Sequence, residues 1–122
     1  MKFMICIFLL LPLISCSGKS GKEEKELATQ AFISCDFLGA KKNAELAVEY
    51  AGSNVEVAVP ALLIIGKSSE FLGQQSSAYD KIVELAPGVN NTSEAKKIAN
   101  QFVQNLSRMA PEKVKACPKL QS

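Results

Sequence analysis

The sequence VEVAVPALLII (residues 55–65) decides whether this chain is all-helical or mixed, because it is the most apolar stretch after the N-terminal region. Its first five residues alternate in the way that is typical of a strand. Its second half is apolar on every side, as in a central helix. No second alternating run exists to pair with a strand. We therefore expect a buried helix with Pro60 in its first turn, where a missing N–H costs nothing.

The function of residues 61–65 has two readings, because an apolar run can line a peptide-binding groove or form the core. A domain of this size has few other residues with which to build a core. We therefore expect core.

The segment before this stretch favours helix over residues 23–50, with a possible break at Gly39 and a stop at residues 52–54. Small and apolar residues recur three and four positions apart, which is the spacing of one helix face. The residues expected on that face are Leu27, Ala31, Phe32, Cys35, Leu38, Ala44, Ala47, Val48 and Ala51.

The segment after it contains two further helix patterns. Ser77 is a plausible cap for a helix through Leu85, and Pro87-Gly88 would end that helix. Residues 91–94 offer the next cap, and Pro111 would open a final short turn. The intervening apolar stripe is the clearest helix signal in the chain: Ala95, Ile98, Ala99, Phe102, Val103, Leu106 and Met109. The sequence thus predicts an all-α fold, a small bundle of four to five helices.

The N-terminal region has the features of a secretory signal. A basic start at Lys2 precedes an apolar run over residues 3–14, which is shorter than the roughly 20 residues of a membrane-spanning helix. The run ends in LISC (residues 13–16). This ending resembles the lipobox of bacterial lipoprotein precursors, with an aliphatic residue three positions before the cysteine and a small residue just before it.

This resemblance implies that residues 1–15 are a lipoprotein signal peptide and that Cys16 carries the lipid that anchors the chain in a membrane. Ser17 replaces the acidic residue that commonly marks inner-membrane retention. The implied location is therefore the outer membrane, facing the periplasm. Residues 16–26 are small, polar and charged, which predicts a flexible tether before a helical domain over residues 27–122.

The four cysteines do not form one set. The lipobox resemblance implies that Cys6 leaves with the signal peptide and that Cys16 takes the lipid, which leaves Cys35 and Cys117. Export places this pair in an oxidising compartment, where a disulfide is expected. The alternative, a redox or metal pair, lacks CxxC spacing and a histidine or third cysteine to complete a zinc site. We expect the disulfide to join the first helix to the end of the last, and we expect no metal and no cofactor.

Composition disfavours several functions. The net charge is +2, which gives no electrostatic footprint for nucleic acid. The chain has no histidine, so it lacks the commonest general base and the commonest metal ligand. No small-molecule substrate is evident from any motif.

Two groups of residues offer formal catalytic chemistry. Lys67 stands beside Ser68 and Ser69, but adjacent residues do not face each other on a helix, and a solvated turn is expected there. Glu45 and Glu49 share a helix face and are expected to be ordinary exposed surface rather than a glycosidase pair. We therefore expect no catalytic residue, and we expect that the protein is not an enzyme.

The surroundings of the paired cysteines carry a second resemblance. The sequences CDFL (residues 35–38) and VKAC (residues 114–117) are similar to the cysteine surroundings of HdeA-type periplasmic acid-stress chaperones, although the cysteines here are much further apart. That resemblance implies a helical fold held by one disulfide, and a chaperone as the alternative function. The leading expectation is a lipid-anchored protein that binds another envelope protein, in an immunity, entry-exclusion or pilotin-like accessory role.

Overall fold

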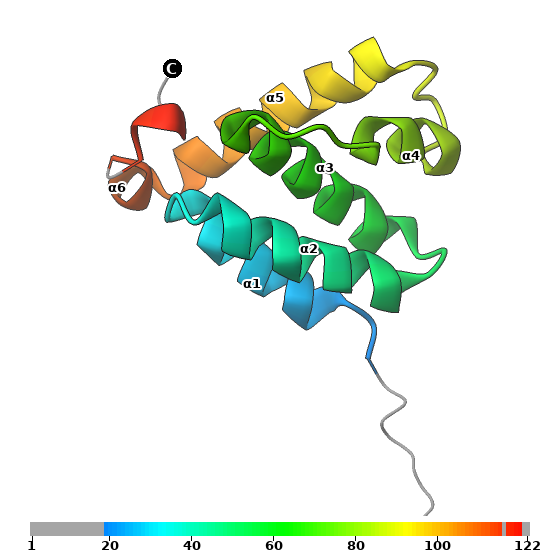
Figure 1. Cartoon of the computed structure of the whole chain (residues 1–122), viewed down its shortest axis with the longest axis horizontal. Helices are drawn as coiled ribbons and strands as arrows, with labels where there is room; N and C mark the ends of the chain where they lie inside the picture. Colours follow the sequence, from blue (N-terminus) through cyan, green and yellow to red (C-terminus); the bar gives the residue numbers. More distant parts are fainter. Residues whose placement is uncertain (1–18, 116, 121–122) are drawn as a thin grey trace, which may run out of the picture.

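The computed structural model describes residues 19–115 and 117–120, and this part of the chain is helical, with no strand (Figure 1). Its elements are α1 (Lys22–Ile33), α2 (Phe37–Ala51), α3 (Val55–Leu72), α4 (Ala78–Leu85), α5 (Thr92–Met109), α6 (Pro111–Val114) and the 3₁₀ turn η2 (Pro118–Leu120). The all-α class is confirmed. The six α-helices exceed the expected four to five because residues 22–51 form two helices and the turn at Pro111 is a short helix of its own.

The break between α1 and α2 lies at residues 34–36 and not at Gly39. Cys35 has a left-handed backbone (φ 68°), which turns the chain out of α1. Asp36 then caps α2, because its Oδ1 accepts a hydrogen bond from the Gly39 N–H at 2.9 Å. A Cβ on Gly39 would collide with the Asp36 carboxylate. The glycine therefore makes room for the cap inside the first turn and does not end the helix.

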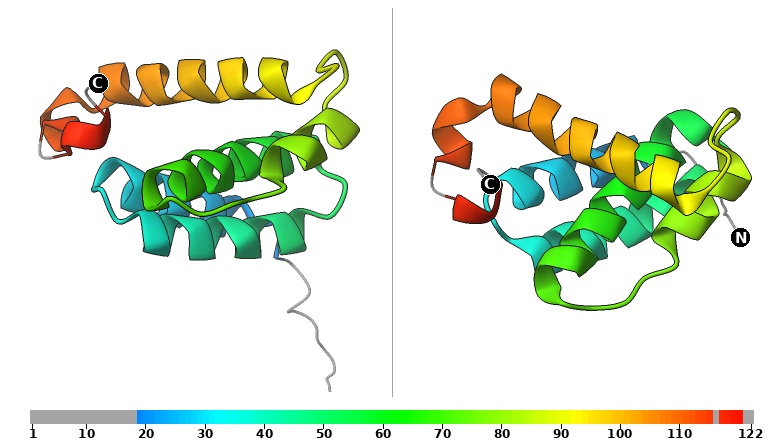
Figure 2. Two further views of the ribbon diagram at one scale, coloured as in Figure 1. Left: turned by 45° about the horizontal axis from the view of Figure 1, so that its top comes forward. Right: turned by 90° about the horizontal axis from the view of Figure 1, so that it is seen from above.

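Helix α3 is the centre of the domain, and α1, α2, α4 and α5 all contact it. Figure 2 shows α2 and α5 on opposite sides of α3. Residues 61–65 are buried, as expected of core. The helix begins at Val55 after the Asn54 cap, so the helical reading of residues 55–65 is confirmed.

Pro60 lies inside α3 and not in its first turn, because the helix starts earlier than the sequence pattern predicts. The pyrrolidine nitrogen cannot donate to the carbonyl of Glu56, one turn back, and this weakens an exposed helix by about 3 kcal/mol. Here Val57, Ala58 and Ala61 are fully buried around the proline. Burial of those side chains offsets the missing hydrogen bond, and the helix continues through Pro60.

The buried face of α1 and α2 differs from the expected one. Leu27 and Leu38 are 52% and 65% exposed. Phe32 is buried as expected, and Ala28, which was not expected on this face, is buried beside it because α1 packs against both α2 and α3. The Phe37 ring packs against the Phe32 and Phe71 rings, with centroids 5.4 and 4.8 Å apart. These aromatic contacts fix the end of the α1–α2 pair that carries Cys35.

The Cys35–Cys117 disulfide is present and encloses a sequence separation of 82 residues. Cys35 lies in the turn after α1 rather than in the helix, and Cys117 lies between α6 and η2. The bond therefore fastens the C-terminal turn to the α1–α2 turn. Cys117 is completely buried.

The N-terminal boundary of the domain also differs from the expected one. Helix α1 begins at Lys22, so residues 22–26, assigned to the tether from sequence, are helical. Glu23 and Glu24 occupy the first turn, where the helix dipole favours negative charge. The expected signal peptide (residues 1–15) and lipidation site (Cys16) lie outside the described residues. Among the described helices, none has the length and apolar character needed to cross a membrane.

Candidate functional site

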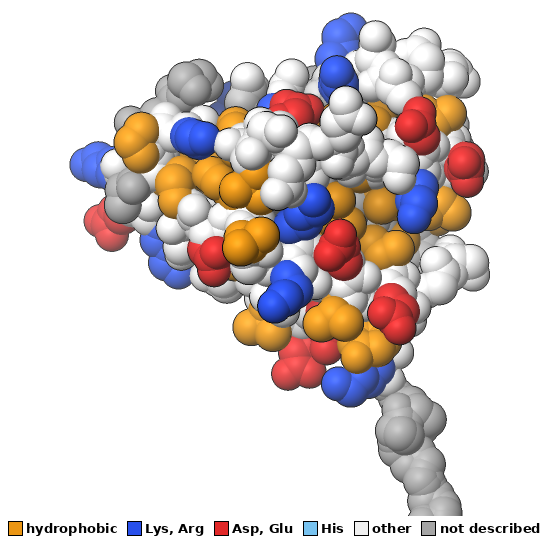
Figure 3. Space-filling view, in the orientation of Figure 1, with side chains coloured by type: hydrophobic (Ala, Val, Ile, Leu, Met, Phe, Trp, Pro, Cys, Tyr) orange, Lys and Arg blue, Asp and Glu red, His pale blue; other side chains and the backbone are white. Residues whose placement is uncertain are grey.

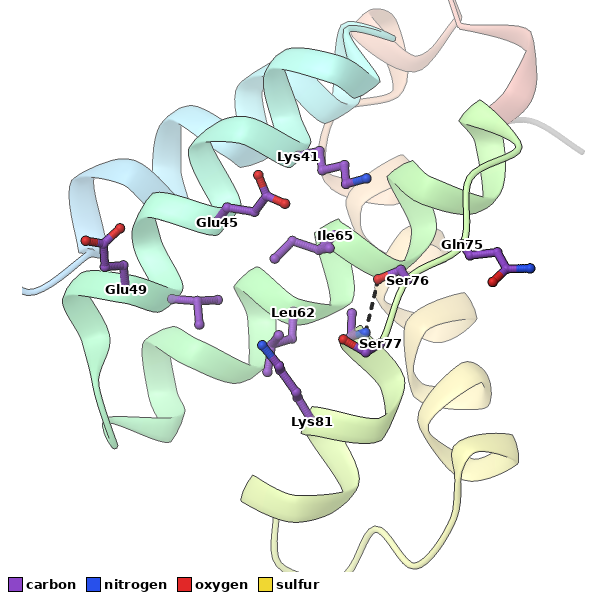
Figure 4. Close-up of a pocket in the computed structure, with 11 residues that line it drawn as sticks. Lys41, Glu45, Glu49, Leu62, Ile65, Gln75, Ser76, Ser77 and Lys81 are labelled. Carbon is purple, nitrogen blue, oxygen red and sulfur yellow. Dashed lines mark hydrogen bonds between the residues drawn. The ribbon is translucent and has the colours of Figure 1, made fainter.

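A groove of about 430 Å³ lies between α2 and the start of α4, with α3 beneath it (Figure 4). Leu62 and Ile65 of α3 form its apolar floor. Its charged residues are Lys41 and Lys81, here called the groove lysines, and Glu45 and Glu49, called the groove glutamates. The groove therefore presents charges of both signs above an apolar surface.

The α2 wall of the groove follows from the helix repeat. Lys41, Glu45 and Glu49 are spaced four residues apart and so share one face. The other side of α2 carries Ala44 and Ala47, which are completely buried. These small side chains let α2 approach its neighbours closely, which turns the charged face outward along the groove.

The opposite wall is formed by α4 and by residues 75–77 of the exposed linker over residues 73–77. Lys41 donates a hydrogen bond to the side-chain carbonyl of Gln74 at 2.7 Å, which joins the linker to α2. The Ser76 hydroxyl accepts from the Ala78 N–H at 3.0 Å, so the side chain that caps α4 is that of Ser76 rather than Ser77 (Figure 4). Ser77 contributes its carbonyl instead, to the N–H of Lys81.

Most groove charges have no partner among the described residues. The side chains of Lys81 and both groove glutamates form no ion pair or hydrogen bond within the described part of the chain. Among the described residues, the one side-chain partner of Lys41 is the neutral amide of Gln74. Figure 4 shows the Lys81 side chain reaching from α4 toward Leu62. These charges remain available to a ligand.

A second hollow of about 530 Å³ continues the groove toward the N-terminus of α2. It shares Lys41 and Glu45 with the first hollow and adds Leu38 and Lys42. The hydrogen bond between Lys41 and Gln74 lies where the two hollows adjoin. Most of the length of α2 therefore borders concave surface. On the face seen in Figure 3, acidic and basic side chains are interspersed among small hydrophobic patches.

The segment Lys67-Ser68-Ser69, expected to be a solvated turn, is buried inside α3. That expectation was wrong because α3 is covered on several sides. The Lys67 ammonium donates to Glu70 Oε1 at 3.0 Å and to Asn100 Oδ1 at 2.9 Å. The buried hydroxyls of Ser68 and Ser69 have no hydrogen-bond partner in the described structure, so neither is paired with the lysine as a nucleophile would be.

Glu70 connects this network to α4. Its Oε2 accepts a hydrogen bond from the Tyr79 hydroxyl at 2.5 Å. Burial by itself would raise the pKa of the Glu70 carboxyl, but the bonds from Tyr79 and Lys67 outweigh it and hold that pKa below its ordinary value. Burial and the Glu70 carboxylate raise the pKa of the Tyr79 hydroxyl. The network ties α3 to α4 and α5, and we interpret it as structural.

The structure brings together residues that the sequence had separated. Glu45 and Glu49 are exposed, as expected, yet both line the groove. Leu62 and Ile65 belong to the core, as expected of residues 61–65, and they also form the groove floor. The sequence did not reveal Lys81 or the linker as part of a site, because their placement depends on how α3 and α4 pack. Within the described residues, no group of three or more Cys, Asp or Glu side chains is arranged to hold a metal ion.

Comparison of the chain with protein-family models, with curated proteins and with solved structures found no match.

Proposed function

We propose that this chain is a lipid-anchored protein of the bacterial cell envelope whose helical domain binds another envelope protein. The observation that carries the proposal is the groove beside α2, with unpaired charges above an apolar floor. Mixed polar rims around apolar centres are typical of protein-binding surfaces. Immunity, entry-exclusion and pilotin-like accessory roles all require such a surface on a small stable domain.

The anchor in this proposal is the lipid on Cys16, in the outer membrane and facing the periplasm, and it rests on the LISC ending of the signal-like segment. A tether raises the local concentration of the domain near envelope partners, so a modest intrinsic affinity is sufficient. Cys16→Ala is expected to abolish labelling with a fatty-acid probe and to release the protein from the membrane fraction. Normal labelling of that variant would contradict the anchor.

Binding is tested by photo-crosslinking in intact envelopes. A photoreactive amino acid at Gln75 sits on the groove wall, whereas Gln101 on α5 is an exposed position that lines none of the grooves described above. We expect a discrete crosslinked product from Gln75, and a weaker one when Cys16 is also replaced by alanine. If neither position gives a product in envelopes that contain the lipidated chain, the binding function is contradicted.

A further inference from the structure

We propose that the groove beside α2 binds an extended peptide segment of its partner. This segment carries an acidic side chain for the groove lysines, a basic side chain for the groove glutamates and an apolar side chain between them. The inference rests on the proposed function and deepens it, because it states the chemistry of the partner at that site.

The charge requirement follows from the unpaired groove side chains. Lys41 stands at the N-terminal end of the groove wall, and Glu45 and Glu49 follow it along α2. Lys81 comes from the other wall. A ligand of a single charge sign would meet like charges at part of this surface, and such juxtapositions are unfavourable at an interface. A segment that carries both signs matches the groove throughout.

The extended conformation follows from the linker wall. The main-chain N–H groups of Gln75, Ser76 and Ser77 donate no hydrogen bond within the described part of the chain. An extended peptide offers free carbonyl groups to such donors, as in recognition by strand addition. A helical segment already uses its main-chain groups internally. The linker therefore favours an extended ligand over a helical one.

The groove also sets the spacing of the two charges. The helical rise places Lys41 and Glu49 about 12 Å apart along α2. An extended chain advances about 3.3 Å per residue. The acidic and basic side chains of the ligand should therefore be about four residues apart, with an apolar side chain between them over Leu62 and Ile65.

The first experiment measures binding of the full-length lipidated chain in detergent to an array of synthetic peptides. Each peptide has one aspartate and one arginine, two to seven positions apart, with a leucine between them. A neutral counterpart of each peptide has asparagine in place of the aspartate and glutamine in place of the arginine. We expect at least severalfold stronger binding of the charged peptide at a spacing of about four, decreasing as salt is added. Equal binding of charged and neutral peptides at every spacing, or no binding, would overturn the proposal.

The second experiment reverses the charge of one groove lysine. Lys81 is exposed and its side chain forms no ion pair or hydrogen bond with any described residue, so Lys81→Glu should leave the fold intact. It should weaken binding of the best peptide about three- to tenfold. A peptide with asparagine in place of the aspartate alone should not bind that variant more weakly than it binds the wild type, because it has no negative charge for the introduced glutamate to repel. Glu84→Lys, an exposed change on the same helix that lies outside the groove, should have no effect.

The outcomes separate this inference from the proposed function. Equal weakening of the aspartate and asparagine peptides by Lys81→Glu would overturn the charge pairing. A crosslink from Gln101 but not from Gln75 would leave the binding function intact and exclude this groove. A Gln75 crosslink between two copies of the chain would identify self-association and overturn the peptide proposal.

Discussion

Helices α3 and α5 have the same length, 18 residues, and opposite surroundings. Helix α3 is buried over most of its length, including Lys67 and two serines. Helix α5 fully buries only Ala95 and Ala99. Its larger apolar side chains, such as Phe102, are partly covered, and Met109 is 80% exposed.

Periodicity and burial are therefore separate properties of a helix. Helix α5 carries the clearest amphipathic stripe in the sequence, but a stripe shows only that one face is covered. Helix α3 has weaker periodicity because nearly every side must be compatible with the core. The attachment of α5 also depends on specific links, namely the hydrogen bond from Lys67 to Asn100 and the nearby disulfide.

The largest expected effect comes from truncating an aromatic side chain beside α3. Phe32 is completely buried and its ring lies 6.1 Å from that of Phe71 in α3. Phe32→Ala should lower the free energy of unfolding by about 3–5 kcal/mol. Phe102→Ala on α5 should cost about half as much, because its side chain is only partly buried. Equal losses in urea denaturation would contradict the contrast between the two helices.

Loss of the disulfide should follow. Replacing both Cys35 and Cys117 by serine should lower the free energy of unfolding by about 2–4 kcal/mol, since the bond closes a long loop. Hydrogen exchange should accelerate most in α5, α6 and η2, which the bond fastens to the α1–α2 turn. If hydrogen exchange accelerated in α3 as much as in α5, α6 and η2, the disulfide would not hold the C-terminal helices specifically. Mass spectrometry of the oxidised protein provides the control for the bond itself.

Gly66→Ala tests how closely α4 packs on α3. Replacing glycine by alanine in a helix interior usually stabilises the helix by about 1 kcal/mol. Here its Cβ would lie 2.6 Å from the Tyr79 ring, and overpacking of this kind costs about 1–3 kcal/mol. We expect net destabilisation in thermal unfolding. In a Tyr79→Leu background, Gly66→Ala should not lower the melting temperature. A lower melting temperature there would mean that the clash with the Tyr79 ring is not the cause.

The smallest expected effect concerns pH. The pKa of Glu70 is lower in the folded protein than its ordinary value of 4.5. The charged form of Glu70 therefore stabilises the fold fully when the pH is above the ordinary pKa of 4.5. This contribution is lost as the pH falls through the lower pKa that Glu70 has in the folded protein. Glu70→Gln should cost about 1 kcal/mol near pH 7.

The same variant should flatten the fall in melting temperature between pH 5 and pH 2. Glu84→Gln, at an exposed position of α4, serves as the control. An unchanged slope in the Glu70 variant would show that this network does not sense acid. Exposure of apolar surface at low pH only in the wild type would instead favour the chaperone alternative.

Much of the fold was predictable because local signals agreed with one another. The apolar run at residues 55–65, the stripe of α5 and the cap at Asn91 identified helices that the structure contains. The Asn91 side chain accepts a hydrogen bond from the Glu94 N–H, as the cap pattern predicts. The errors at Pro60 and Gly39 arose where packing or a neighbouring cap outweighed the usual preference of the residue.

The helical class could be predicted from the sequence alone, because helix periodicity is a local property. The resemblance to lipoprotein precursors set Cys6 and Cys16 aside and so predicted the Cys35–Cys117 pair that the structure joins. Only the tertiary structure placed Lys81 and the linker opposite the α2 carboxylates. Only it buried Lys67 with Glu70, Tyr79 and Asn100. A groove and a buried network each require side chains from several helices, and their meeting depends on how those helices pack against α3.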